Sequence, residues 1–137
     1  MEKSEKLGFV QSPVGRFLEL DDTPEKNAKL TVAFLGQGVG ADYATGVMLE
    51  YKRRRDWIAQ GMIHDALVSS LPKTWTPEEV YAFGKFMECE TPRLPGFTCP
   101  VKMEVGPNWG TMYELEKQED KIMMKTKDGW VPAKWEW

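Results

Sequence analysis

The sequence predicts an α+β fold with an N-terminal β-hairpin, two central helices and a C-terminal antiparallel β-meander of about four strands. Two patterns support this prediction. In the middle of the chain, apolar residues recur every three or four positions, which is the helical period. Near both ends they alternate at period two, which is the strand period. With 137 residues and no convincing linker, we expect a single domain spanning 1–137, in which residues 1–7 form a disordered tail.

The N-terminal hairpin is predicted from two segments that flank a polar loop. Residues 16–20 form the first segment, after turn residues at positions 12–15. Residues 29–35 form the second, because Leu30, Val32 and Phe34 stand at period two. The connecting sequence DDTPEKN contains a proline, which interrupts a strand ladder. We therefore expect the two segments to pair with each other.

A glycine-rich turn follows the second segment. Residues 36–41 read G-x-G-x-x-A between a predicted strand and a predicted helix, which is the context of a dinucleotide-binding loop. The acidic ribose partner expected about 20 residues later is missing, since that position falls inside the predicted helix. A flexible connection is thus the better-supported interpretation. Nucleotide or phosphate binding at Gly36, Gly38 and Gly40 is the third of our functional hypotheses.

The first helix is predicted to run from Gly40 to Pro72. Its apolar stripe consists of Ala44, Met48, Tyr51, Ile58, Met62 and Ala66. It also carries the main basic cluster, with an aromatic neighbour, namely Lys52, Arg53, Arg54, Arg55 and Trp57. Such a cluster can bind nucleic-acid phosphates while aromatic rings stack on bases. Successive helical residues, however, point about 100° apart, and acidic residues four positions away can pair with these cations. A solvated helix face is therefore the favoured interpretation.

The second helix is predicted from Pro77 to about Cys89. Thr76 can cap it, the proline suits its first position, and Glu79 can complete a capping box. Trp75 and Val80 stand at the positions of a hydrophobic staple.

The C-terminal meander follows a proline-rich loop at 91–100. Its strands are predicted at 101–105, 111–116, 121–127 and 130–137. We expect turns at residues 106–108 and at Asp128-Gly129, and Pro132 places the last strand at an edge of the sheet.

The meander is rich in aromatic residues, which stand among lysines. The five that we single out are Trp109, Tyr113, Trp130, Trp135 and Trp137. Core packing and an exposed surface for a partner explain them about equally well. Residues 101–137 contain six lysines against seven acidic residues, so their net charge is −1. This balance weakens, without excluding, the hypothesis that the sheet binds single-stranded nucleic acid.

Composition limits the classes of function. The net charge of −3 argues against a strongly basic nucleic-acid domain. One histidine and two cysteines, without H-x-x-x-H or C-x-x-C spacing, favour neither a metal site nor a catalytic one, so we predict no metal and no cofactor. A pairing of His64 with Cys89 or Cys99 would need spatial contact. Without a signal peptide or an apolar run of about 20 residues, we expect a cytoplasmic protein without membrane contact.

These observations favour a small, non-enzymatic binding or regulatory protein that docks aromatic and methionine side chains on a protein partner. Proteins of this general type include accessory proteins of phages and mobile elements. The alternative is a single-stranded nucleic-acid-binding protein that uses the sheet together with the basic helix segment 52–55.

Overall fold

The computed structural model describes residues 8–20, 23–54 and 60–137. The chain divides into two compact units, one comprising residues 1–69 and 90–97, and the other residues 70–89 and 98–137. The backbone therefore passes between the units at three points in the sequence. This division does not test whether the chain folds as one domain, so the single domain expected from the sequence remains a prediction.

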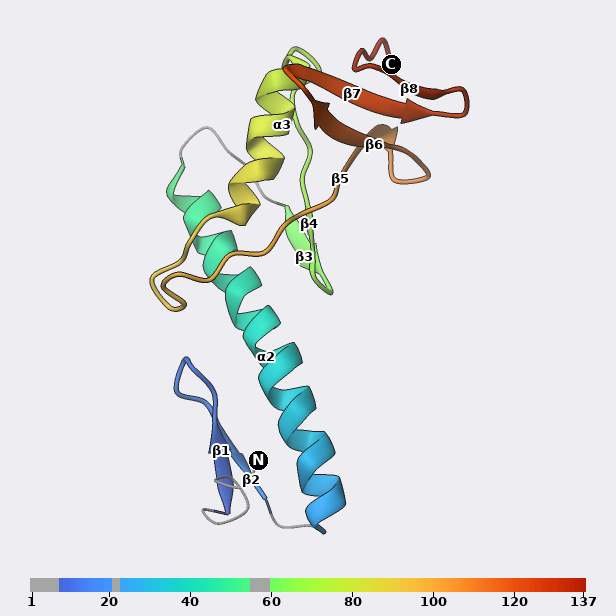
Figure 1. Cartoon of the computed structure of the whole chain (residues 1–137). Coiled ribbons are helices and arrows are strands. Elements are labelled where there is room, and N and C mark those ends of the chain that lie inside the picture. The colour runs from blue at the N-terminus through green and yellow to red at the C-terminus, as the bar shows by residue number, and fades with distance from the viewer. Residues whose placement is uncertain (1–7, 21–22, 55–59) are drawn as a thin grey trace. The chain divides into compact units, whose positions relative to one another are not determined.

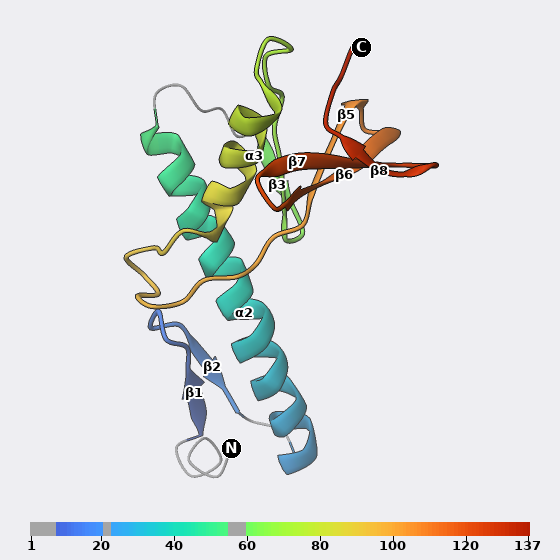
Figure 2. The same ribbon diagram turned by 45° about the horizontal axis from the view of Figure 1, so that its top comes forward.

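The first unit is built around one long helix (Figure 1). Its elements are β1 (Phe9–Gln11), β2 (Phe17–Glu19), α2 (Pro24–Arg53), β3 (Gly61–Ile63) and β4 (Ala66–Val68). The strands form two separate antiparallel hairpins, β1–β2 and β3–β4. In both Figure 1 and Figure 2 the β1–β2 hairpin lies alongside the N-terminal half of α2.

The second unit consists of a short helix and a four-stranded antiparallel sheet. Its elements are α3 (Pro77–Lys85), the 3-10 turn η1 (Phe86–Glu88), β5 (Met103–Asn108), β6 (Thr111–Gln118), β7 (Lys121–Thr126) and β8 (Gly129–Pro132). The strand order is β5-β6-β7-β8, so the sheet is a simple meander. The α+β prediction, with its N-terminal hairpin, two helices and four-stranded meander, is confirmed.

The predicted strand at residues 29–35 is wrong, because this segment is helical. Pro24 occupies the first turn of α2 and Glu25 adds an acidic residue there, both of which favour a helix start. The alternation of apolar residues is short enough to fit either period. A strand would have buried Leu30 and Val32 and exposed Thr31. In the structure Thr31 is buried, whereas Leu30 and Val32 are exposed. The N-terminal hairpin instead pairs Phe9 with Glu19.

The predicted helix from Gly40 to Pro72 is wrong at both ends. It begins sixteen residues earlier, at Pro24, and α2 ends at Arg53. Residues 61–68 form a β-hairpin in which Ile63 pairs with Ala66, so Met62 and Ala66 do not extend a helical stripe. The two-residue turn of this hairpin contains His64 with φ of 55°, a conformation that suits a tight hairpin turn. Residues 55–59, including Arg55, Trp57 and Ile58, lie outside the described residues.

The predicted start of α3 is confirmed. Thr76 accepts a hydrogen bond from the Glu79 N–H at 3.2 Å, and the Glu79 carboxylate accepts one from the Thr76 N–H at 2.7 Å. This is a complete capping box. The Trp75 ring meets the Phe83 ring edge-on, with centroids 5.9 Å apart, and packs against the cluster that contains Val80.

The sheet has two unlike faces, set by the alternation of its side chains. The inner face packs against α3 through Val80, and its buried centre consists of Leu115, Ile122 and Met124. The alternate positions form the outer face, with Glu114, Glu116, Met123, Lys125 and Trp130. Both edge strands lie as the meander predicts, and Pro132 is in β8, an edge strand.

Two predicted turns differ in detail. Residues 106–108 belong to β5, where the register shifts between Val105 and Asn108 as in a β-bulge, and the chain turns at Trp109-Gly110 instead. A Cβ on Gly106 would lie 1.7 Å from the Thr111 carbonyl oxygen, so this close approach requires glycine. The turn expected at Asp128-Gly129 is one residue earlier, because Thr126 pairs with Gly129.

Candidate functional site

Three of the five predicted partner-binding aromatics lie together on the inner face of the sheet. The Trp137 ring stacks on the Tyr113 ring and on the Trp135 ring, with centroids 5.9 Å apart in each pair. All three are half-buried and pack against the core cluster. Because the three rings pack against this cluster, core packing accounts for much of their area.

The other two aromatics lie elsewhere in the second unit. Trp130 is on the outer face, half-buried, with the Lys125 ammonium 5.9 Å from its ring centroid. Trp109 lies in the two-residue turn between β5 and β6, and 67% of it is exposed. The five residues therefore do not form one surface. Met112, three positions after Trp109, is another exposed apolar side chain. Neighbouring residues of a strand point to opposite faces, so the sequence could have shown that Met112 lies on the face opposite to Tyr113.

The basic cluster lies at the C-terminal end of α2. Lys52 and Arg53 are in its last turn, where positive charge offsets the helix dipole, and Arg54 is the C-cap residue. The Arg53 guanidinium donates to Glu50 at 2.7 Å. The predicted partners Arg55 and Trp57 lie outside the described residues. The described part of the cluster has the features of a solvated helix end.

The glycine-rich loop expected at Gly36, Gly38 and Gly40 is wrong, because all three residues lie inside α2. A phosphate-binding loop needs free backbone N–H groups at a helix N-terminus, whereas N–H groups in a helix interior are bonded to carbonyls one turn earlier. A Cβ on any of the three would meet nothing within 4 Å. The structural context of a dinucleotide site is therefore missing at these residues.

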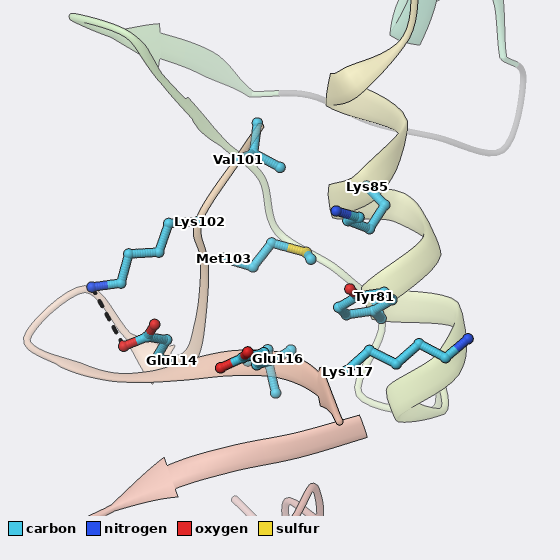
Figure 3. Close-up of a pocket in the computed structure, with 9 residues that line it drawn as sticks. Tyr81, Lys85, Val101, Lys102, Met103, Glu114, Glu116 and Lys117 are labelled. Atoms are coloured by element: carbon cyan, nitrogen blue, oxygen red, sulfur yellow. Dashed lines mark ion pairs between the residues drawn. The ribbon is translucent and has the colours of Figure 1, made fainter. Parts of the chain in front are cut away.

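Sequence analysis missed an open pocket of about 420 Å³ in the second unit. It lies between α3, the chain entering β5, and β6 (Figure 3). Its lining is amphipathic and consists of Tyr81, Lys85, Val101, Lys102, Met103, Glu114, Leu115, Glu116 and Lys117. No spacing rule relates α3 to a segment about 20 residues later, so the sequence alone carried no signal for this pocket.

A carboxylate bridge shapes one wall of the pocket. Glu88 Oε1 accepts hydrogen bonds from Lys85 Nζ at 2.7 Å and from the Val101 N–H at 2.9 Å. We call this arrangement the Glu88 bridge. The hydrogen bonds from Lys85 and from the Val101 backbone lower the pKa of Glu88 below its usual range. The hydrogen bond to Glu88 in turn raises the pKa of Lys85.

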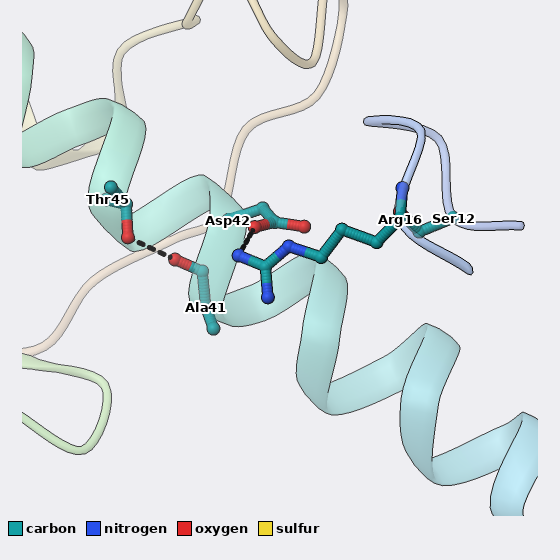
Figure 4. Close-up of polar contacts among 5 residues, drawn as sticks. All are labelled: Ser12, Arg16, Ala41, Asp42 and Thr45. Atoms are coloured by element: carbon teal, nitrogen blue, oxygen red, sulfur yellow. Dashed lines mark hydrogen bonds and ion pairs between the residues drawn. The ribbon is translucent and has the colours of Figure 1, made fainter. Parts of the chain in front are cut away.

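The first unit contains a buried charge. The Asp42 side chain is 1% exposed and pairs with the guanidinium of Arg16, which comes from the turn between β1 and β2 (Figure 4). Ser12, in the same turn, is buried and accepts a hydrogen bond from the Arg16 N–H at 3.1 Å. Polar residues thus line the buried side of α2, which explains why the apolar pattern there misled the strand prediction.

Two classes of site find no support in the described parts of the chain. Within residues 8–20, 23–54 and 60–137, histidine, cysteine, aspartate and glutamate nowhere gather in threes that could hold a metal ion. Cys89 and Cys99 are not joined by a disulfide bond, and each is half-buried. No helix in these ranges combines the length and apolarity that a bilayer crossing requires.

Comparison of the chain with models of protein families, with curated proteins and with solved structures finds no match.

Proposed function

We propose that this protein binds a protein partner through the outer face of its four-stranded sheet and the adjoining Trp109 turn. The observation that carries the proposal is the exposure of Trp109, of which 67% is open to solvent at a hairpin turn. A tryptophan ring supplies a large contact area at low conformational cost, and tryptophan is enriched among the residues that dominate binding energy.

The surroundings of Trp109 support a protein partner. Met112, the second residue of β6, is exposed, and the outer face adds Met123, Trp130 and Pro132. Methionine adapts to differently shaped partners. Charged side chains surround these apolar groups, as in the rim of a typical protein interface.

The charges of the outer face disfavour the nucleic-acid alternative. This face carries Glu104, Glu114 and Glu116 against Lys121, Lys125 and Lys102, whose ammonium lies beside Glu104 and Glu114, so it has no excess of cations. A phosphate backbone requires an excess of cations. On this face the Lys125 ammonium over the Trp130 ring favours single-stranded nucleic acid, which we keep as the second candidate.

The inner-face aromatics are not part of the proposed surface. Tyr113, Trp135 and Trp137 bury one side of their rings against the core cluster. Their substitution would change stability, so a loss of binding in such variants would not identify a contact surface.

The experiment is affinity capture from the native host with the full chain and two variants. Trp109→Ala removes the proposed anchor, and Phe17→Ala removes an aromatic residue of similar exposure, 63%, from the first unit. We expect partners captured by the wild type and by Phe17→Ala to be lost with Trp109→Ala. Equal capture by all three proteins would contradict the proposal. Anisotropy of labelled single-stranded DNA and RNA at low salt tests the second candidate, for which tight binding would replace the first.

A further inference from the structure

The pocket beside α3 contains an unpaired stretch of β6. β5 begins at Met103, which pairs with Leu115, whereas β6 continues to Gln118. Continued pairing would place Val101 opposite Lys117, two residues further along each strand. The Val101 N–H instead donates to Glu88, so the Glu88 bridge holds this part of the chain away from β6.

The register shows which way the Lys117 backbone points. In an antiparallel pair, facing residues alternate between bonding each other and bonding their outer neighbours. Lys117 faces Ile122 on β7, and the Ile122 carbonyl accepts from the Ala133 N–H on the side of β8. Lys117 and Ile122 are thus a pair without mutual hydrogen bonds. The Lys117 N–H and C=O point the other way, toward the pocket that β5 has left, where no described residue pairs with them.

Two polar side chains reach into the same pocket from α3. Figure 3 shows the Tyr81 hydroxyl and the Lys85 ammonium on the pocket side of the helix. An ammonium has three N–H donors, and Glu88 accepts one from Lys85. The lining holds three lysines and two glutamates, and Lys102 Nζ lies 3.4 Å from the Glu114 carboxylate. With Glu88, which pairs with Lys85, the three lysines are matched by three carboxylates, so any preference for an acid rests on the spare donors of Lys85 and Tyr81 and not on net charge.

We propose that this pocket binds an extended peptide segment that carries an acidic side chain. One peptide residue takes the place that Val101 leaves vacant, and pairs its N–H and C=O with the C=O and N–H of Lys117, as in strand addition. Side chains of facing residues lie on the same face of a sheet. The side chain of this residue therefore lies on the inner face, beside Tyr81 and Lys85, where a carboxylate accepts hydrogen bonds from both.

The pocket shares Glu114 and Glu116 with the outer face, but the proposed contacts are to the Lys117 backbone, Tyr81 and Lys85, so the inference does not depend on the proposed function. Backbone pairing at a single residue gives little specificity for side chains. The acidic preference comes from the Tyr81 hydroxyl and the Lys85 ammonium.

Amide hydrogen exchange of the ¹⁵N-labelled full chain tests the backbone part of the proposal. The probe is the capped peptide acetyl-Thr-Val-Glu-Val-Thr-amide at millimolar concentration. We expect the Lys117 amide to exchange at least about tenfold faster than those of Glu116 and Gln118 in the free protein, and to slow about tenfold with the peptide. A protected Lys117 amide in the free protein, or one that the peptide leaves unchanged, would overturn the proposal.

Substitutions and simple anions test the side-chain part. Tyr81→Phe and Lys85→Gln should each weaken peptide binding about tenfold, as should glutamine in place of glutamate in the peptide. Tyr113→Phe and Lys127→Gln are the matched controls and should bind as the wild type does. Sodium acetate and inorganic phosphate should leave the exchange of Lys117 unchanged. Equal protection by either anion would show a site for free anions and would refute strand addition.

Discussion

Thr91 lies directly against Gly46, so that a Cβ on this glycine would be 2.9 Å from the Thr91 side chain. The contact joins α2 to the loop at residues 90–97 within the first unit. This packing requires a glycine at position 46. At the other glycines of α2 an added Cβ would meet nothing within 4 Å.

Alanine substitutions in α2 should therefore have opposite effects. Gly46→Ala should lower the free energy of unfolding by about 1–3 kcal/mol, because the methyl group overlaps Thr91. Gly36→Ala and Gly40→Ala should each raise it by about 0.5–1 kcal/mol, because alanine favours the helix and nothing obstructs it. Urea unfolding followed by circular dichroism measures all three. A loss of stability in Gly36→Ala would mean that this residue is not in an open helix interior.

The pair between Arg16 and Asp42 predicts an asymmetric result. The Asp42 side chain is 1% exposed and that of Arg16 is 57% exposed. Arg16→Met leaves a buried carboxylate without its cation and should cost about 1–3 kcal/mol, less than for a fully buried pair because the guanidinium is partly solvated. The double variant with Asp42→Leu should recover most of this loss.

Lys29→Met is the control for this prediction, because the Lys29–Glu25 pair is exposed on both sides. It should change the free energy of unfolding by less than about 0.5 kcal/mol. An Arg16→Met variant as stable as Lys29→Met would show that the buried carboxylate does not depend on Arg16.

The tryptophans of the second unit should separate into two classes. Trp137→Ala should cost about 1–3 kcal/mol of unfolding free energy, since its ring stacks on Tyr113 and Trp135. Trp109→Ala should change it by less than about 0.5 kcal/mol, as expected for an exposed residue. Thermal unfolding checks both values. Equal destabilisation would mean that Trp109 is part of a packed cluster and would remove the basis of the proposed function.

The Glu88 bridge predicts a limited dependence of stability on pH. The pKa of Glu88 is lowered from its ordinary value of 4.5, so its contribution is full above that pH and is lost as the pH falls through the lower folded value. The pKa of Lys85 is raised from 10.5, so its contribution is full below that pH and is lost above it. The stabilisation should thus be constant between roughly pH 5 and pH 10.

Comparison with Glu88→Gln measures this contribution. We expect a difference of at most about 1 kcal/mol at pH 7, because the Lys85 and Glu88 side chains are 40% and 25% exposed. The difference should shrink below pH 4.5, the ordinary value for this carboxyl. Glu136→Gln, which removes a more exposed pair with Lys134, should show no such trend. A difference that grows on acidification would contradict the assigned pKa direction.

Short-range signals in the sequence predicted their elements well. The capping box of Thr76 and Glu79 joins residues three positions apart, so any chain with this sequence can form it before other contacts exist. The meander follows from period-two segments and tight turns, and Pro132 marks an edge because it lacks an N–H. These elements were predictable because the residues that stabilise them are close in sequence.

Burial decided what the sequence left open. The pattern of residues 29–35 fits either a strand or a helix. The helix is favoured because it places Thr31 and Asp42 on the buried side of α2. Asp42 is paired there with Arg16 from the β1–β2 turn. The five aromatics of the meander look alike in sequence. The inner face covers three of them, whereas Trp109 lies in an exposed turn.

The sequence by itself therefore determined the α+β class, the capped second helix and the C-terminal meander, because local hydrogen bonds and residue periodicity encode them. Only the tertiary structure decided where α2 begins, which tryptophan is exposed and where β6 is left unpaired. The last depends on Glu88 holding Val101, which is 13 residues away in the chain. Such contacts are specified by packing in three dimensions, and no pattern along the chain records them.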